Sequence, residues 1–181
     1  MNTKYKVRKD ISKTFRGKTI YRIEALKDFG DVKKGDLGGW IEKEFFLSDK
    51  GNCWIYDNAI VIGDSRVMCN AKVCNNVIVY GSVTINGNAI VKDNAKLCGY
   101  VKVNDNAIIE GSAVVRGYAS IAGSAKVCDN ATIKDKATLS GNCIAKENSI
   151  IGGFANVCDH AEIGGESRIK DNVTIGGKTE T

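Results

Sequence analysis

The chain has 181 residues, of which 43% are hydrophobic and 26% are charged, so the sequence predicts a soluble, folded protein and excludes a disordered one. No apolar run approaches the about 20 residues of a membrane-spanning helix, and none follows the basic N-terminus. We therefore expect a cytoplasmic protein without a secretory signal or a membrane partner. The net charge of +5 resides in residues 1–50, and so modest an excess favours solubility first and an acidic partner second.

Residues 1–52 are the first predicted element, a basic N-terminal cap region. Two segments, YKVR and KTIYRIEAL, have the composition of strands, and the turn-like FRGK separates them. Large aromatic residues follow near the end of this region, where core packing is a more common role than binding: Trp40, Phe45, Phe46 and Trp54.

Residues 53–181 repeat with a period of six, which fits neither a helix nor a flat strand. An aliphatic residue recurs at every sixth position from Ile55 to Ile175, and only Ala145 is undersized. Small residues, such as Ala107, recur four places after the aliphatic ones. Three hexapeptide sides close a triangular coil, and successive coils hydrogen-bond at about 4.8 Å. The 21 aliphatic positions thus predict seven coils of three hexapeptides each, with equivalent positions 18 apart in the sequence.

The corners of these coils are marked by Gly or Asp before Asn or Ser, because such residues adopt turn and left-handed conformations at low cost. The predicted corner pairs include Asp57-Asn58, Gly87-Asn88, Asp93-Asn94, Gly111-Ser112 and Asp129-Asn130.

This pattern resembles the hexapeptide repeat of the left-handed parallel β-helix, over about residues 55–180. The resemblance implies an all-β fold with left-handed coils, and a coil end needs a cap, which residues 1–52 would supply. Ile41 and Leu47 are six apart and predict an incipient first coil, followed by a two-residue insertion before Ile55.

A second resemblance spans the head and the first repeats. FGDVKKGDLGGWIEKE, followed by GNCWIYDNA, is similar to the start of YdcK-like hexapeptide proteins of enterobacteria, bacteriophages and prophages. That resemblance implies a phage-associated protein, and the family has a fold but no settled activity.

Many hexapeptide-repeat proteins transfer acyl groups from a coenzyme A thioester, usually as trimers with a histidine as general base. The one histidine, His160, would play that part, with acetyl-CoA or acyl-CoA as cofactor. Steps of 18 back from His160 reach mostly asparagines, which favours a local hydrogen-bonding role instead: Asn142, Ser124, Asn106, Asn88 and Asn70. No loop interrupts the register to complete a pocket. We therefore favour a protein without catalysis or cofactor, and keep the O- or N-acyltransferase as the alternative.

One corner of the predicted prism carries aromatic and basic side chains. Columns of residues 18 apart bring together the candidate binding residues Tyr80, Tyr100, Tyr118, Phe154, Arg116, Lys134, Lys136 and Lys170. Such residues stack on rings and pair with phosphates. Packing under the head or against a second subunit is the alternative.

Outward aliphatic residues predict a covered face. They form two columns, one with Ile60, Ile78, Val114 and Ile150, the other with Ile90, Ile108 and Ile144. Stacked branched residues on a flat face favour a homo-oligomer, and this fold favours a trimer.

The seven cysteines have no paired spacing, so we expect reduced thiols and no metal site. Together these features predict a non-catalytic, rigid binding or scaffold protein. The phage resemblance implies sharper versions: an inhibitor of a host defence protein, or a protein that sequesters a nucleotide signal. We expect no specific DNA recognition.

Overall fold

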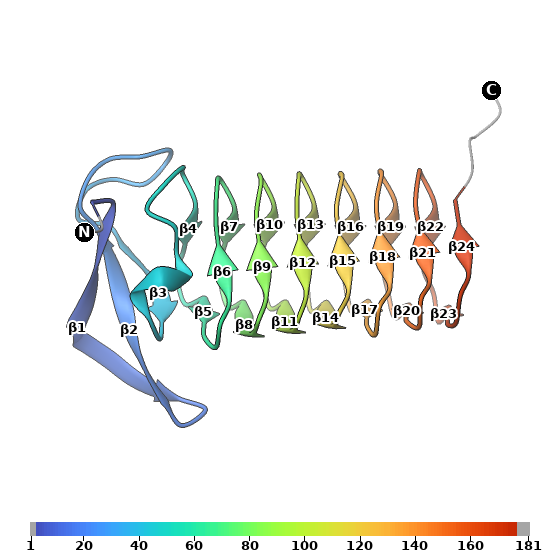
Figure 1. Cartoon of the computed structure of the whole chain (residues 1–181), viewed down its shortest axis with the longest axis horizontal. Helices are drawn as coiled ribbons and strands as arrows, with labels where there is room; N and C mark the ends of the chain where they lie inside the picture. The colour runs from blue at the N-terminus through green and yellow to red at the C-terminus, as the bar shows by residue number, and fades with distance from the viewer. Residues whose placement is uncertain (1–2, 177–181) are drawn as a thin grey trace.

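The computed structural model describes residues 3–176 and shows a β-solenoid whose coils stack in one row, with an N-terminal hairpin at one end (Figure 1). This confirms the predicted all-β fold of parallel stacked coils. One 3-10 turn, η1 (Glu44–Phe46), interrupts the strands. Within the described range, no helix is long and apolar enough to cross a membrane. The left hand of the coils stays a prediction.

Three sheets form the sides. The ten-stranded sheet contains, in order, β1 (Tyr5–Phe15), β2 (Lys18–Ala25), β3 (Leu37–Ile41), β5 (Ile60–Val61), β8 (Ile78–Gly81), β11 (Lys96–Gly99), β14 (Val114–Gly117), β17 (Thr132–Ile133), β20 (Ile150–Ile151) and β23 (Arg168–Ile169). A seven-stranded sheet contains β4 (Trp54–Ile55), β7 (Lys72–Val73), β10 (Ile90–Val91), β13 (Ile108–Ile109), β16 (Lys126–Val127), β19 (Ile144–Ala145) and β22 (Glu162–Ile163). The other contains β6 (Arg66–Val67), β9 (Thr84–Ile85), β12 (Lys102–Val103), β15 (Ser120–Ile121), β18 (Thr138–Leu139), β21 (Asn156–Val157) and β24 (Thr174–Ile175).

Strands in successive coils pair in parallel, and the partners are three hexapeptides apart in the sequence. Leu97 lies beside Val115, and Ile90 lies beside Ile108. The ten-stranded sheet has one solenoid strand more than the others, because β3 already pairs in parallel with β5. The predicted incipient first coil is thereby confirmed, and the coils begin inside the region predicted as the cap. Residues 177–181, the end of the predicted repeat region, lie outside the described residues.

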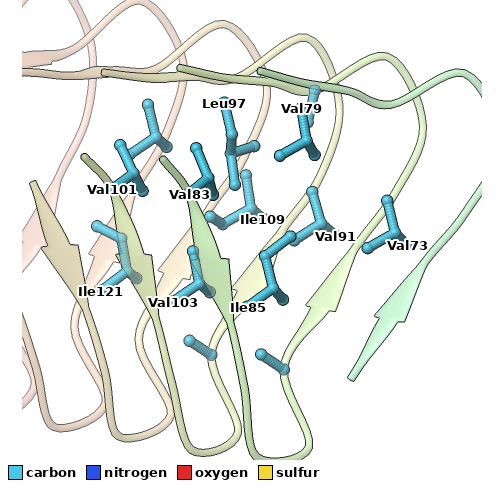
Figure 2. Packing of buried hydrophobic residues seen from close by; sticks show 14 of the residues in the cluster. Val73, Val79, Val83, Ile85, Val91, Leu97, Val101, Val103, Ile109 and Ile121 are labelled. Carbon is cyan, nitrogen blue, oxygen red and sulfur yellow. The ribbon is translucent and has the colours of Figure 1, made fainter. Parts of the chain in front are cut away.

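The aliphatic positions of the repeat point into the prism (Figure 2). Leu97, Ile109 and Ile121 are fully buried, and so is the undersized Ala145. Burial of such side chains is worth roughly 1.5–3 kcal/mol each, so the interior column is the main source of stability.

The predicted corner residues adopt positive φ, with values of 51° at Asp57, 63° at Asp93 and 69° at Gly111. The Asp side chains have a second role there, because Oδ2 of Asp93 accepts a hydrogen bond from the Gly111 N–H at 3.0 Å. Corner carboxylates thus link one coil to the next.

The N-terminal region caps the solenoid. Tyr5 and Ile23 of the hairpin are buried in the same hydrophobic cluster as Trp54 of the first regular coil. Phe46 is also buried, which confirms the core role predicted for these aromatics, but Phe45 is 59% exposed.

Candidate functional site: an aromatic and basic ridge

The candidate ridge lies at the corner between the ten-stranded sheet and the β6–β24 sheet. Tyr100 occupies the turn between β11 and β12, after Gly99 with a φ of 92°. The Tyr100 N–H donates to the Gly117 carbonyl oxygen at 2.7 Å, so Tyr118 falls at the same place one coil later. The predicted column is therefore confirmed.

Tyr100 and Tyr118 form a stacked pair. Their ring centroids are 4.9 Å apart and their planes differ by 4°. This separation matches the about 4.8 Å spacing of paired strands, so the rings stack along the axis of the solenoid. Tyr100 is 57% exposed and Tyr118 is 60% exposed.

The next two coils extend this arrangement. Nζ of Lys136 lies 4.9 Å from the centroid of the Phe154 ring, and Phe154 is 60% exposed. We call Tyr100, Tyr118, Lys136 and Phe154 the aromatic ridge. Exposed cations accompany it in the neighbouring column, at Arg116 and Lys170.

Acidic side chains also lie at this corner, at Asp64, at Asp171 and, between Lys134 and Lys136, at Asp135. The Asp135 carboxylate accepts a hydrogen bond from the Gly153 N–H at 3.0 Å and lies 3.6 Å from Nζ of Lys134. The Gly153 bond, followed by the nearby Lys134 and Arg116, lowers the pKa of Asp135. The negative charge of Asp135 is therefore offset by Lys134 at the same corner.

Tyr80 is separated from the ridge by the hairpin. Its ring packs against the cluster of Ile20, Ile60 and Ile62, and Cζ of Arg16 lies 4.1 Å from its centroid. Among the predicted binding residues, Tyr80 therefore takes the alternative role of packing under the head.

Phe45 is exposed at the start of the same corner, so the core role predicted for it is wrong. Nζ of Lys43 lies 5.7 Å from the Phe45 ring and 4.0 Å from Asp64, which begins the ridge column. The two-residue insertion hides this relationship, because steps of 18 from the ridge do not reach residue 45.

The two outward aliphatic columns are present as predicted. Ile78 and Ile150 are half-buried on the ten-stranded sheet, and Ile90, Ile108 and Ile144 are half-buried on the β4–β22 sheet. Ile60 differs, because the hairpin covers it and leaves it 6% exposed. Ile60 therefore packs within its own chain and is not available to a second subunit. That the other members, including Val114, form a subunit interface stays a prediction.

His160 is one step of a corner ladder. Its Nε2 lies 3.1 Å from Nδ2 of Asn142. The same ladder runs through Asn70, Asn88 and Asn106, whose amides are linked by bonds of 3.1 Å. The predicted local hydrogen-bonding role is confirmed. Within residues 3–176, no group of three or more His, Cys, Asp or Glu side chains is arranged to hold a metal ion.

A segment of 65 residues, 35% of this chain, is 42% identical to the uncharacterized acetyltransferase YdcK of Escherichia coli (strain K12). The chain is similar to YdcK. This finding confirms the resemblance predicted from the sequence, and the solenoid is consistent with it. The matched part covers 20% of the length of YdcK. No family model matches the chain. The phage association stays a prediction.

Proposed function

We propose that this protein is a rigid, non-catalytic binding or scaffold protein that contacts its partner through the aromatic ridge. The observation that supports this most directly is the stacked pair of Tyr100 and Tyr118, each more than half exposed. Tyrosine supplies a large contact area with few rotatable bonds, so it is favoured in binding surfaces.

The backbone under the ridge is well suited to hold it in place. The N–H groups of Tyr118 and Lys136 donate to carbonyl oxygens of the following coils at 2.6 and 2.8 Å. A surface that is already ordered loses less conformational entropy when it binds. The ridge therefore needs no rearrangement to receive a partner.

We also propose that the protein forms a homo-oligomer, with a trimer favoured, through the half-buried aliphatic columns that include Ile78 and Ile108. Inhibition of a host defence protein and sequestration of a nucleotide are narrower versions of the same proposal.

Site-specific photo-crosslinking tests the binding role. A photoreactive phenylalanine analogue replaces Tyr118 in cells that naturally make the protein, and the control carries it at Lys34, an exposed head residue. We expect a crosslinked adduct from position 118 and none from position 34. Equal crosslinking from both positions, or none from position 118, would contradict a role for the ridge.

The second candidate is an acetyltransferase, because the similar protein YdcK is named an uncharacterized acetyltransferase. His160 would be the base and acetyl-CoA or acyl-CoA the cofactor. The fit is poor, because Asn142 already engages Nε2 of His160 on an exposed corner. Calorimetry with acetyl-CoA, on wild type and on His160→Ala, tests this candidate. Tight binding together with turnover that His160→Ala abolishes would overturn the non-catalytic proposal.

A further inference from the structure

The aromatic side chains that the protein leaves exposed all gather at one corner. Four aromatic residues are more than half exposed among residues 3–176: Phe45, Tyr100, Tyr118 and Phe154. Three are members of the ridge, and the fourth lies at the start of the same corner, where Nζ of Lys43 is 5.7 Å from the Phe45 ring and 4.0 Å from Asp64. The described parts of the other two corners carry no such ring. This distribution indicates a ligand with several flat groups in a row.

One face of the Tyr100 ring is not covered by another of the rings that the structure describes. Tyr118 covers one face of the Tyr100 ring, and the other face points toward the preceding coil. Its neighbour there is Ser82, which is too short to cover a phenol ring. A planar ring that stacks on this face of Tyr100 would lie at the level of Ser82, about 4.8 Å along the axis.

Exposed cations flank the rings on both sides. Lys102 follows Tyr100 by two residues on the β6–β24 sheet, and Arg116 precedes Tyr118 by two residues on the ten-stranded sheet. In the described chain, neither of these side chains nor Lys136 has a carboxylate within ion-pair distance. Three charges next to the rings are therefore available to an anionic ligand.

Within the described residues, the other two corners lack this combination of exposed rings and unpaired cations. At the corner after the β4–β22 sheet, carboxylates recur at Asp57, Asp93 and Asp129 and bond the backbone of the next coil. The third corner carries the amide ladder of Asn70 and Asn88 together with the carboxylate of Asp105, which accepts a hydrogen bond from the Gly123 N–H. The ridge is therefore the corner at which we expect an anionic ligand to bind.

We infer that the ridge binds unpaired polynucleotide, RNA or DNA, with bases stacked on the rings and phosphates on Lys102, Arg116 and Lys136. This inference rests on the proposed function and names its ligand class. Single-strand binding combines aromatic platforms with positive charge, and it is tolerant of sequence. Duplex DNA fits less well, because its bases are stacked on one another. Lysine is depleted from protein interfaces, so the exposed lysines favour a polynucleotide over a protein.

Fluorescence anisotropy tests this inference with the full-length protein. The probes are a labelled 12-nucleotide RNA of mixed sequence, the DNA of the same sequence and the matching DNA duplex, each in 50 and 200 mM salt. We expect both single strands to bind and the duplex to bind at least about tenfold more weakly. Three neutralised phosphates predict about twentyfold weaker single-strand binding at the higher salt. The single strand that binds more tightly, RNA or DNA, identifies the natural class of ligand.

Matched variants locate the binding surface. Tyr100→Ala/Tyr118→Ala should weaken single-strand binding about tenfold or more, whereas Tyr100→Phe/Tyr118→Phe should retain it, because phenylalanine also stacks. Arg116→Ala/Lys136→Ala should weaken binding and reduce its salt dependence. Lys34→Ala/Lys50→Ala removes the same charge from exposed positions elsewhere and should change binding less than twofold. Thermal unfolding of each variant verifies that it is folded.

Three results would overturn the inference. The first is the absence of single-strand binding at 100 µM protein in 50 mM salt, and the second is equal binding of duplex and single strand. The third is single-strand binding that Tyr100→Ala/Tyr118→Ala leaves unchanged. The crosslinking experiment separates this failure from that of the proposed function. A protein adduct at position 118 without polynucleotide binding leaves the proposed function standing, and the absence of both removes both.

Discussion

Ile41 pairs in parallel with Val61, and Val61 pairs in parallel with Val79. The sequence separation of the first pair is two residues longer than that of the second. The first coil therefore contains two more residues than each regular coil. The extra residues fall after Leu47, because Leu47 bridges Val67 at the same longer step. This enlarged coil is where the N-terminal strand is attached.

Asp49, in the enlarged part of the first coil, binds the backbone at the beginning of the described chain. Its Oδ1 accepts hydrogen bonds from the backbone N–H groups of Thr3 and Lys4, at 2.9 and 2.8 Å. We expect Asp49→Ala to lower the free energy of unfolding by about 1–2 kcal/mol, because two bonds to a charged acceptor are lost. Urea unfolding measures this change. Asp64→Ala is the control. The Asp64 carboxylate is exposed and lies as far as 4.0 Å from Nζ of Lys43, so its loss should change the free energy of unfolding by less than about 0.5 kcal/mol. Equal effects of the two changes would contradict the role of Asp49.

Neighbouring isoleucines on β13 test which side chains support the core. Ile109 is fully buried inside the prism, and Ile108 faces outward and is half-buried. We expect Ile109→Ala to cost about 2–5 kcal/mol, as is usual for a large-to-small change in a core. Ile108→Ala should cost much less in the monomer. Urea unfolding of both variants at low protein concentration measures the contrast, and a reversed order would mean that the interior has been assigned to the wrong face.

The sequence predicts the solenoid well, because every coil of three hexapeptides requires the same residue types at the same positions. Inward positions need an aliphatic residue, and corners such as Gly111 need positive φ, so both leave a periodic trace. The hairpin leaves no such trace, since its place depends on pairing with β3 and on the packing of Ile20 against Ile60 and Ile62. For the same reason, no period reveals that Tyr80 is covered.

Glu110 gives a pH-dependent contribution to stability. Its carboxylate lies 2.6 Å from Nζ of Lys126 and 2.9 Å from Nζ of Lys92, and these contacts lower its pKa below the ordinary value of 4.5. A lowered carboxylate pKa stabilises the fold above pH 4.5, and this contribution is lost as the pH falls through the lowered value. We expect Glu110→Gln to cost about 0.5–1 kcal/mol at pH 7, since the lysines are partly solvated.

Denaturant unfolding at several pH values measures this contribution. The difference between wild type and Glu110→Gln should disappear once the pH falls below the lowered pKa of Glu110, where the carboxyl is protonated in both the folded and the unfolded state. Glu44→Gln, at an exposed position of η1, removes the same charge and supplies the control; it should change the free energy of unfolding little. A cost for Glu110→Gln that persists in acid would indicate a packing effect instead of an ionic one.

The cysteines report on burial. Cys143 occupies an inward position, and burial raises its pKa to about 11, whereas Cys69 is exposed at a corner. Because the thiolate is the reactive form, we expect iodoacetamide at pH 8 to modify Cys69 in the native protein and Cys143 only after unfolding. Peptide mass spectrometry after timed quenching locates the modified residues. Rapid native modification of Cys143 would contradict a closed interior.

The functional site was only partly predictable. The period places Tyr100, Tyr118 and Phe154 in one column, because column membership follows from residue number alone. It does not reveal that the two tyrosines stack, that Lys136 sits over Phe154, or that Phe45 is exposed beside Lys43. These relationships depend on rotamers and on the insertion.

All of these conclusions require that residues 100 and 118 are nearest neighbours in adjacent coils. Mild oxidation of Tyr100→Cys/Tyr118→Cys tests this directly, because Cα atoms one coil apart are within reach of a disulfide. Peptide mapping by mass spectrometry should find an intramolecular link between positions 100 and 118. Tyr100→Cys/Lys136→Cys, two coils apart, should stay unlinked at those positions. A link between 100 and 136, or the absence of a link between 100 and 118, would contradict the coil of three hexapeptides and the ridge built on it.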